Sequence, residues 1–329
     1  MRKVIPIILV LLYGIFITCN REKQPLLPKV TGKPGEVIIV VDEFIWNSEI
    51  GKSLNNILTS PFEALPQIEP SYDPVRISSS AFTNIFKSHR NIIIAKISPR
   101  NKKPRILVQR DVWAKPQIVI NLFGPNDSTT VEYLKLNREK LINLLDQAEI
   151  NRTNINYRKN RAKVIDDSLR KKHHVSLSVP IGYEVGVDSA DFVWISHELS
   201  DLTQSILIYN YSYTDSNTFT PEYLINKRNE FTKKYIPGPD PGSYMTVEQS
   251  FPASFHEYTR DNQYCAELRG LWKLENGFMG GPFINMAILD ENRNQVVTVD
   301  AFVYAPGLDK RNYVRELEAI LNTFKSTSE

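Results

Sequence analysis

The chain has 329 residues, of which 42% are hydrophobic, 10% aromatic and 23% charged, an ordinary composition for a globular protein with room for two domains. Its formal charge is +3, from 40 Lys and Arg against 37 Asp and Glu, and two of the positive charges, Arg2 and Lys3, stand in the first three residues. The remainder is nearly neutral, so net charge gives no argument for a nucleic-acid or acidic-lipid partner.

The first predicted element is a signal peptide over residues 1–18. A charged start is followed by an uncharged, mainly aliphatic run from Val4 to Thr18. This run is shorter than the roughly 20 residues that cross a bilayer as a helix, and it suits the apolar region of a signal peptide. Phe16-Ile17-Thr18-Cys19 resembles a bacterial lipobox, in which the cysteine is lipidated. Because Thr18 and Phe16 depart from the usual residues, an uncleaved short anchor and plain secretion stay open.

Residues 19–35 follow as a polar segment punctuated by Pro and Gly, which predicts a flexible tether. We expect lipid on Cys19 to hold the protein at a membrane of the cell envelope, with the outer membrane favoured, on its periplasmic or surface side. Cys265 is the only other cysteine, so a mature chain lipidated at Cys19 has no internal disulfide.

Residues 36–130 predict an N-terminal α/β domain. Glu36–Asp42 is a continuous apolar run, typical of a strand buried on both faces. An amphipathic helix follows and ends at Pro61, and serines 78–80 precede a short helix. Further strands are predicted over 91–97, 105–112 and 117–123.

Residues 131–172 predict one long helix that links two halves of the chain. Apolar residues from Val131 to Ile155 fall on a heptad seam, which Arg138 and Arg152 interrupt, and a bend is expected near Asn154–Asn156. Basic residues gather towards its end. They form either a solvated face or a contact to a polyanion or lipid headgroup.

Residues 173–326 predict a C-terminal domain rich in strands. Helices are expected from Pro221 to about Tyr235 and, with a clear amphipathic pattern, over the last residues from Val314 to Phe324. An antiparallel sheet with covering helices satisfies this order, similar to the sandwich of the PsbP and Mog1 proteins. The fold class is therefore α+β, with two α/β-type domains joined by a long helix.

Nucleotide and metal chemistry have little support. Gly51-Lys52-Ser53 follows a strand as in a phosphate-binding loop, but Trp46 stands where that motif requires its first glycine. The five histidines show no helical pair at i, i+4, and Cys265 has no neighbouring cysteine. We expect no cofactor, no metal, no nucleotide and no nucleic acid.

Candidate catalytic residues are the carboxylates Asp42, Glu43 and Glu69. Asp42 and Glu43 follow the first strand, and ligands of open α/β sheets bind at that end. Trp46 and Gln67 could contribute to binding there. The alternative is that these carboxylates only cap helices.

Two aromatic groups are candidate binding residues. Tyr209, Tyr211 and Tyr213 alternate, so they share one face of a strand and either stack a glycan or peptide or pack under a helix. Trp272 and Phe278 flank a Gly-rich segment that forms either a binding rim or a packed hairpin.

Several motifs resemble one family, namely Leu65-Pro66-Gln67-Ile68-Glu69-Pro70, Arg269-Gly270-Leu271-Trp272, Met279-Gly280-Gly281-Pro282-Phe283 and Lys310-Arg311. They are similar to the domain-of-unknown-function family 4837, predicted lipoproteins of Bacteroidota, over nearly the whole mature chain. The resemblance implies an envelope lipoprotein and transfers no catalytic residue. The leading hypothesis is a non-catalytic binding or assembly module with an envelope protein or glycan as partner. The alternative is an envelope enzyme that acts on glycan or peptide through its carboxylates.

Overall fold

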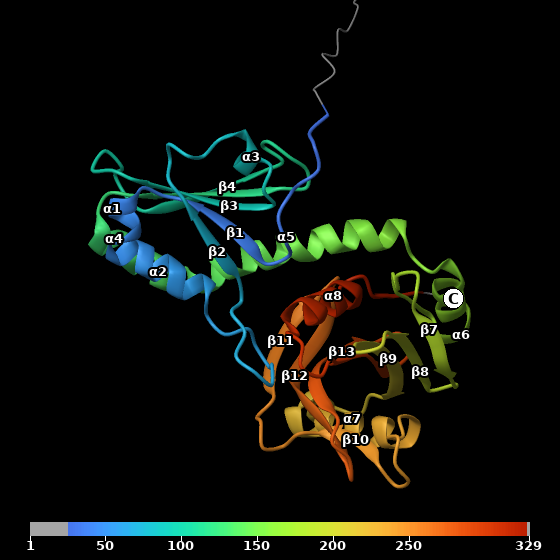
Figure 1. Ribbon diagram of the computed structural model, residues 1–329. Coiled ribbons are helices and arrows are strands. Elements are labelled where there is room, and N and C mark those ends of the chain that lie inside the picture. Colours follow the sequence, from blue (N-terminus) through green and yellow to red (C-terminus); the bar gives the residue numbers. More distant parts are fainter. Residues whose placement is uncertain (1–25, 328–329) are drawn as a thin grey trace, which may run out of the picture.

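The computed structural model describes residues 26–327 (Figure 1). The predicted signal peptide 1–18, Cys19 and the tether up to residue 25 lie outside these residues, and those expectations stay predictions. Among residues 26–327, no helix is both long enough and apolar enough to cross a membrane.

The N-terminal domain is built on a five-stranded sheet in the order β2-β1-β3-β5-β4. The central strands are parallel, and β4 alone runs antiparallel, to β5. Parallel strands are buried on both faces, which explains the unbroken apolar run of β1. The strands are β1 (Glu36–Val40), β2 (Asp73–Ile77), β3 (Asn91–Ile97), β4 (Arg105–Arg110) and β5 (Ile118–Gly124).

Helices cover this sheet unequally. On one face, Ile39 packs in a core with Leu54 of α2 and Leu145 of α5. The opposite face carries a smaller core, in which Ile92 packs with Phe86 of α3. The helices are α1 (Glu43–Trp46), α2 (Glu49–Leu58), α3 (Asn84–Lys87), α4 (Asp127–Leu136) and α5 (Arg138–Lys159).

The sequence Gly51-Lys52-Ser53 lies inside α2 and does not form a loop. A Cβ on Gly51 would lie 1.9 Å from the carbonyl oxygen of Trp46, so the glycine allows α1 and α2 to approach closely. Lys52 pairs with Glu49 at 2.7 Å on the exposed side of the helix. Helix packing thus accounts for the glycine.

The single helix expected over 131–172 is wrong, because the segment forms α4, α5 and α6 (Lys163–His173). At the first break, the side chain of Asn137 donates to the carbonyl oxygen of Tyr133. At the second, the Ala162 N–H donates to Val179 at 2.8 Å, a backbone bond outside any helix. At residues 154–156, where a bend is expected, α5 continues as a helix to Lys159.

The C-terminal domain contains an eight-stranded antiparallel sheet in the order β10-β12-β13-β14-β9-β8-β7, with β11 paired to β12. A separate short pair joins β6 and β15. The strands are β6 (Val175–Ser176), β7 (Glu184–Asp188), β8 (Phe192–Glu198), β9 (Thr203–Ser212), β10 (Tyr244–Val247), β11 (Ser254–Arg260), β12 (Gln263–Glu275), β13 (Gly280–Asp290), β14 (Gln295–Tyr304) and β15 (Lys325–Ser326).

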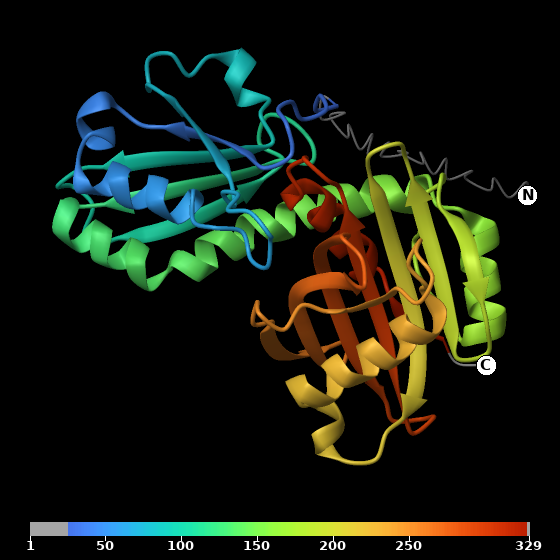
Figure 2. The same ribbon diagram turned by 60° about the horizontal axis from the view of Figure 1, so that its bottom comes forward.

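Both faces of this sheet are covered by helices (Figure 2). One face packs its core against α7 (Pro221–Tyr235), which follows the short 3-10 helix η1 (Ser216–Phe219). The other face packs against α6 and α8 (Arg311–Leu321). The predicted α+β class, with an antiparallel sheet and covering helices, is confirmed.

Candidate functional site

The predicted carboxylate site does not form. Asp42 and Glu43 are exposed beyond the end of β1, where Asp42 accepts a hydrogen bond from the Ser79 N–H at 3.2 Å. Glu69 precedes β2, whose first residue pairs with the first residue of β1. Because the two strands are parallel, the length of β1 separates Glu69 from Asp42, and Trp46 stays with Asp42 on α1. The expectation of a shared acid/base site is wrong.

Glu69 instead joins the two domains. Its buried carboxylate accepts hydrogen bonds from the backbone N–H groups of Lys310 and Arg311, at 2.7 and 2.8 Å, where α8 begins. The Gln67 side chain donates to the carbonyl oxygen of Leu308 and accepts from the Lys310 ammonium. Two of the motifs noted in the sequence therefore meet at the domain interface.

The tyrosine stripe packs under α7 and does not form an open stacking platform. Tyr209 is buried, stacks on Phe231 at 4.5 Å between ring centroids and accepts a hydrogen bond from Asn285. Tyr211 is half-buried, and burial raises the pKa of its phenol. The ring centroid of Tyr213 lies 6.0 Å from that of Phe219. The helix-packed alternative therefore describes these side chains.

The two candidate binding residues of the Gly-rich hairpin, Trp272 and Phe278, lie in different environments. Trp272 is buried, and its indole N–H donates to the carbonyl oxygen of Val303 at 3.2 Å. It contacts Phe302 edge-on and cannot line a binding rim. Phe278, in the turn of the hairpin, is fully exposed and stays a candidate contact residue.

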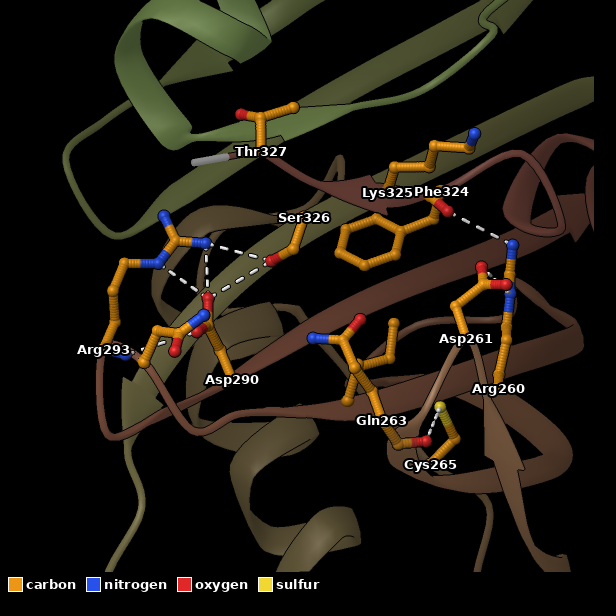
Figure 3. Close-up of a pocket in the computed structure, with 12 residues that line it drawn as sticks. Arg260, Asp261, Gln263, Cys265, Asp290, Arg293, Phe324, Lys325, Ser326 and Thr327 are labelled. Atoms are coloured by element: carbon orange, nitrogen blue, oxygen red, sulfur yellow. Dashed lines mark hydrogen bonds and ion pairs between the residues drawn. The ribbon is translucent and has the colours of Figure 1, made fainter. Parts of the chain in front are cut away.

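A pocket of about 920 Å³ lies at one end of the C-terminal sheet (Figure 3). The arginine side chains that line this pocket form hydrogen bonds within the protein. Arg293 donates to Asp290 at 2.6 Å and to Ser326, and Arg260 donates to the carbonyl oxygens of Leu321 and Phe324 at the end of α8. These guanidinium groups hold the segment from Leu321 to Ser326 in place.

Cys265, Ile288 and Phe324 are among the residues that line this pocket. Burial raises the pKa of the Cys265 thiol to about 11. A thiol attacks as the thiolate, so Cys265 is protonated and inert at neutral pH. Cys265 therefore does not provide this pocket with a reactive thiolate.

A second concavity of about 950 Å³ lies between the two domains, and we call it the interdomain cleft. The segment after α2 and one side of α5 form its N-terminal wall, and β11, β12 and α8 form its C-terminal wall. Its lining residues are Ser60, Pro61, Phe62, Glu63, Ser71, Arg138, Glu139, Ile142, Asn143, Asp146, Gln147, Ile150, His256, Tyr258, Glu267, Arg269 and Glu318.

Three carboxylates surround one guanidinium in this cleft. Arg269 donates to Glu267 at 2.6 Å and to Glu318 at 2.7 Å, and Glu63 lies 3.8 Å away. Glu63 also pairs with His256 at 3.2 Å. Around Arg269 the negative charges therefore exceed the positive ones when His256 is neutral.

The carboxyl groups of the cleft differ in their environment. Burial alone would raise the pKa of Glu63, but hydrogen bonds from Ser254 and His256 and the charge of Arg269 outweigh it and lower that pKa. Burial raises the pKa of Asp146, which accepts hydrogen bonds from Tyr72 at 2.5 Å and Arg315 at 2.9 Å. These contacts fix the positions of Glu63 and Asp146, as the recognition of a partner requires.

The sequence motifs gave one signal towards the cleft, since Arg269 opens Arg269-Gly270-Leu271-Trp272. Its partners Glu63, His256 and Glu318 stand far apart in the chain and belong to no local pattern. Among residues 26–327, no group of three or more His, Cys, Asp or Glu side chains is placed to hold a metal ion.

Comparison with family models divides the chain at the same place as the structure. Residues 162–323 match the domain of unknown function DUF4837. Residues 30–158 match a different one, the domain of unknown function DUF8532. The resemblance to family 4837 is thus confirmed for the C-terminal domain. Its extension to nearly the whole mature chain is wrong, because Leu65–Pro70 falls within DUF8532.

Solved structures show distant likenesses, and no curated protein matches the sequence. The Ran-binding protein Mog1p of Saccharomyces cerevisiae is 11% identical, with a TM-score of 0.33 over 47% of this chain and 91% of its own. LpqN, described as involved in cell envelope biogenesis of Mycobacterium tuberculosis, is 14% identical, with a TM-score of 0.29 over 47% and 83%. The lipid transfer domain of human StarD13 is 9% identical, with a TM-score of 0.23 over 44% and 89%. At these scores the likenesses carry no argument about function.

Proposed function

We propose that this protein is a non-catalytic binding module, held at a membrane of the cell envelope by lipid on Cys19. The anchor is inferred from the charged start, the apolar run and Phe16-Ile17-Thr18-Cys19. The interdomain cleft is the binding site, and an envelope protein or glycan is its partner.

One observation carries the choice of binding over catalysis: Glu63, Glu267 and Glu318 share the guanidinium of Arg269. A general acid or base needs a pKa near the working pH and access to the substrate proton. The competing function, an envelope enzyme acting through Asp42, Glu43 and Glu69, loses its geometric basis because these groups lie at opposite ends of β1.

The composition of the cleft favours a protein partner that presents basic groups. Its surplus carboxylates complement positive charge, and complementary charge favours specific association. Phe62, Ile142 and Tyr258 add apolar surface to the same cleft. A segment that alternates basic and apolar side chains matches both features.

The experiment is photo-crosslinking from the full-length chain in its native envelope. A photoreactive residue at Asn143, exposed on the cleft wall, should capture a reproducible partner, whereas one at Glu222 on α7 should not. Glu139→Lys, an exposed charge reversal in the cleft, should reduce capture at least several-fold without changing thermal unfolding. Equal capture from Asn143 and Glu222, or no reproducible product, would contradict the proposal.

A further inference from the structure

The described chain begins along one edge of the N-terminal sheet. The Lys115 N–H donates to Pro28 at 2.8 Å, and the Thr31 N–H donates to Ser88 at 2.9 Å. Lys115 and Ser88 precede β5 and β3, so this is the edge where the parallel strands start. The backbone is therefore held to the domain from Pro28 onward.

Few residues separate this point from the predicted lipid. Nine peptide bonds separate Cys19 from Pro28. A chain segment of that length spans at most about 30 Å when fully extended. The edge that holds Pro28 would therefore stay within roughly 30 Å of the bilayer surface.

The surface around this edge combines exposed apolar and basic side chains, and we call it the tether-side surface. It consists of the exposed Leu26, Leu27, Lys29, Ile85 and Lys115 and the half-buried Lys87. Leu26 is fully exposed and Ile85 is 79% exposed. In Figure 1, α3, which carries Ile85 and Lys87, lies on the opposite side of α5 from the C-terminal sheet.

Acidic groups beside this surface leave its positive charge in excess. Asp111 pairs with Lys115 at 3.6 Å, and Glu36 is occupied by His89 at 3.0 Å. Among the contacts of the described residues, the Lys87 ammonium interacts only with the neutral side chain of Asn84. Lys29 is exposed.

We propose that the tether-side surface lies against the lipid headgroups, with Leu26, Leu27 and Ile85 entering the interface and the lysines meeting phosphates. This inference rests on the proposed lipid at Cys19 and adds the orientation of the domain. Apolar side chains flanked by lysines bind at the boundary between headgroups and acyl chains, and lysines near an anionic surface strengthen the contact. The C-terminal sheet then projects away from the membrane.

The test uses the full-length lipoprotein in vesicles of phosphatidylethanolamine and phosphatidylglycerol. In the lipidated protein the Cys19 sulfur carries the lipid and Cys265 is buried, so an introduced cysteine is the thiol open to a fluorescent label. Ile85→Cys and the control Phe278→Cys both place the label at an exposed apolar position. A quencher attached to lipid headgroups should quench the label at residue 85 at least threefold more than at residue 278.

Two results separate the orientation from the anchor. Equal quenching at both positions, in protein that carries fatty acid and floats with the vesicles, would overturn the orientation alone. Protein without fatty acid would overturn the anchor, and the orientation with it. Protection of residue 85 that depends on protein concentration and not on lipid would show a second copy on this surface, which also overturns the proposal.

The lysines provide an independent comparison. Lys87→Gln with Lys115→Gln should at least halve the quenching at residue 85 on these anionic vesicles. Lys102→Gln with Lys103→Gln removes the same charge from the segment between β3 and β4, at the other end of the sheet, and should leave quenching unchanged. Equal effects of the two pairs would overturn the role of the tether-side surface.

Discussion

Glu149 is a buried carboxylate on α5 that binds two guanidinium groups. Arg152 lies 3.0 Å and Arg90 3.3 Å from its oxygens, and the Asn91 amide donates to it at 2.7 Å. Burial alone would raise its pKa, but the two arginines and Asn91 outweigh burial, so the pKa of Glu149 lies below the ordinary 4.5.

This lowered pKa predicts how stability depends on pH. A carboxylate with a depressed folded-state pKa contributes stability above its unfolded pKa, and that contribution is lost as the pH falls through the folded value. Glu149→Gln should therefore be less stable than wild type at pH 7, by about 3 kcal/mol, because the buried Arg152 and the half-buried Arg90 lose their counter-charge. The deficit should shrink as the pH falls below about 4.5.

Urea unfolding at pH 7 and at lower pH measures this difference. Glu132→Gln, at an exposed position on α4, is the matched control and should follow wild type at both pH values. A deficit for Glu149→Gln that stays constant with pH would contradict the assignment of Glu149 as the charged partner.

At the same scale, the sequence predicted some residue roles and missed others. Alternation placed Tyr209, Tyr211 and Tyr213 on one face, but no local pattern shows that α7 covers that face. Arg152 interrupts the heptad seam, and only the structure shows that Glu149 and Asn91 compensate its buried charge. Burial and pairing depend on residues distant in the chain.

At the scale of elements, α8 is capped by a side chain from the other domain. Glu69 accepts from two N–H groups at the start of the helix, and Arg311 of the same helix pairs with Asp73 at 2.7 Å. A negative charge at a helix N-terminus is favourable both as an acceptor and through the helix dipole.

Glu69→Ala should destabilise the protein by about 2 kcal/mol, since two N–H groups lose their acceptor and cap replacements cost up to that amount. Hydrogen exchange should accelerate at Lys310 and Arg311, which checks the location of the effect. Glu43→Ala removes an exposed carboxylate and should change neither measurement. Unchanged exchange at α8 in Glu69→Ala would contradict the capping role.

The elements themselves were largely predictable from sequence. Runs of apolar residues predicted β1, β3 and β5, and Pro221 marked the first residue of α7. The break at Asn160–Ala162 was missed because it depends on backbone bonding to Val179, which no helical pattern reveals. The interdomain cleft was also missed, because its walls come from segments that are distant in the sequence.

At the scale of the whole molecule, the two domains meet across α8, and the interdomain cleft lies beside this contact. Arg315 of α8 pairs with Asp146 of α5 at 2.9 Å, which adds an ion pair across the interface at the cleft wall. A binding site between two domains depends on both walls keeping their positions. The polar contacts of α8 therefore serve the site as well as the fold.

Lipid attachment at Cys19 is the claim on which the membrane anchor and the orientation of the tether-side surface both depend. It requires Cys19 to receive lipid although Thr18 precedes it. Cys265 is the control residue, because it is buried in the C-terminal sheet and should receive none.

The most direct measurement is incorporation of labelled fatty acid into the full-length protein in its native cells. Wild type and Cys265→Ala should incorporate the label and fractionate with membranes, and Cys19→Ala should lose both properties. Equal labelling of wild type and Cys19→Ala, or no labelling of either, would contradict the membrane anchor.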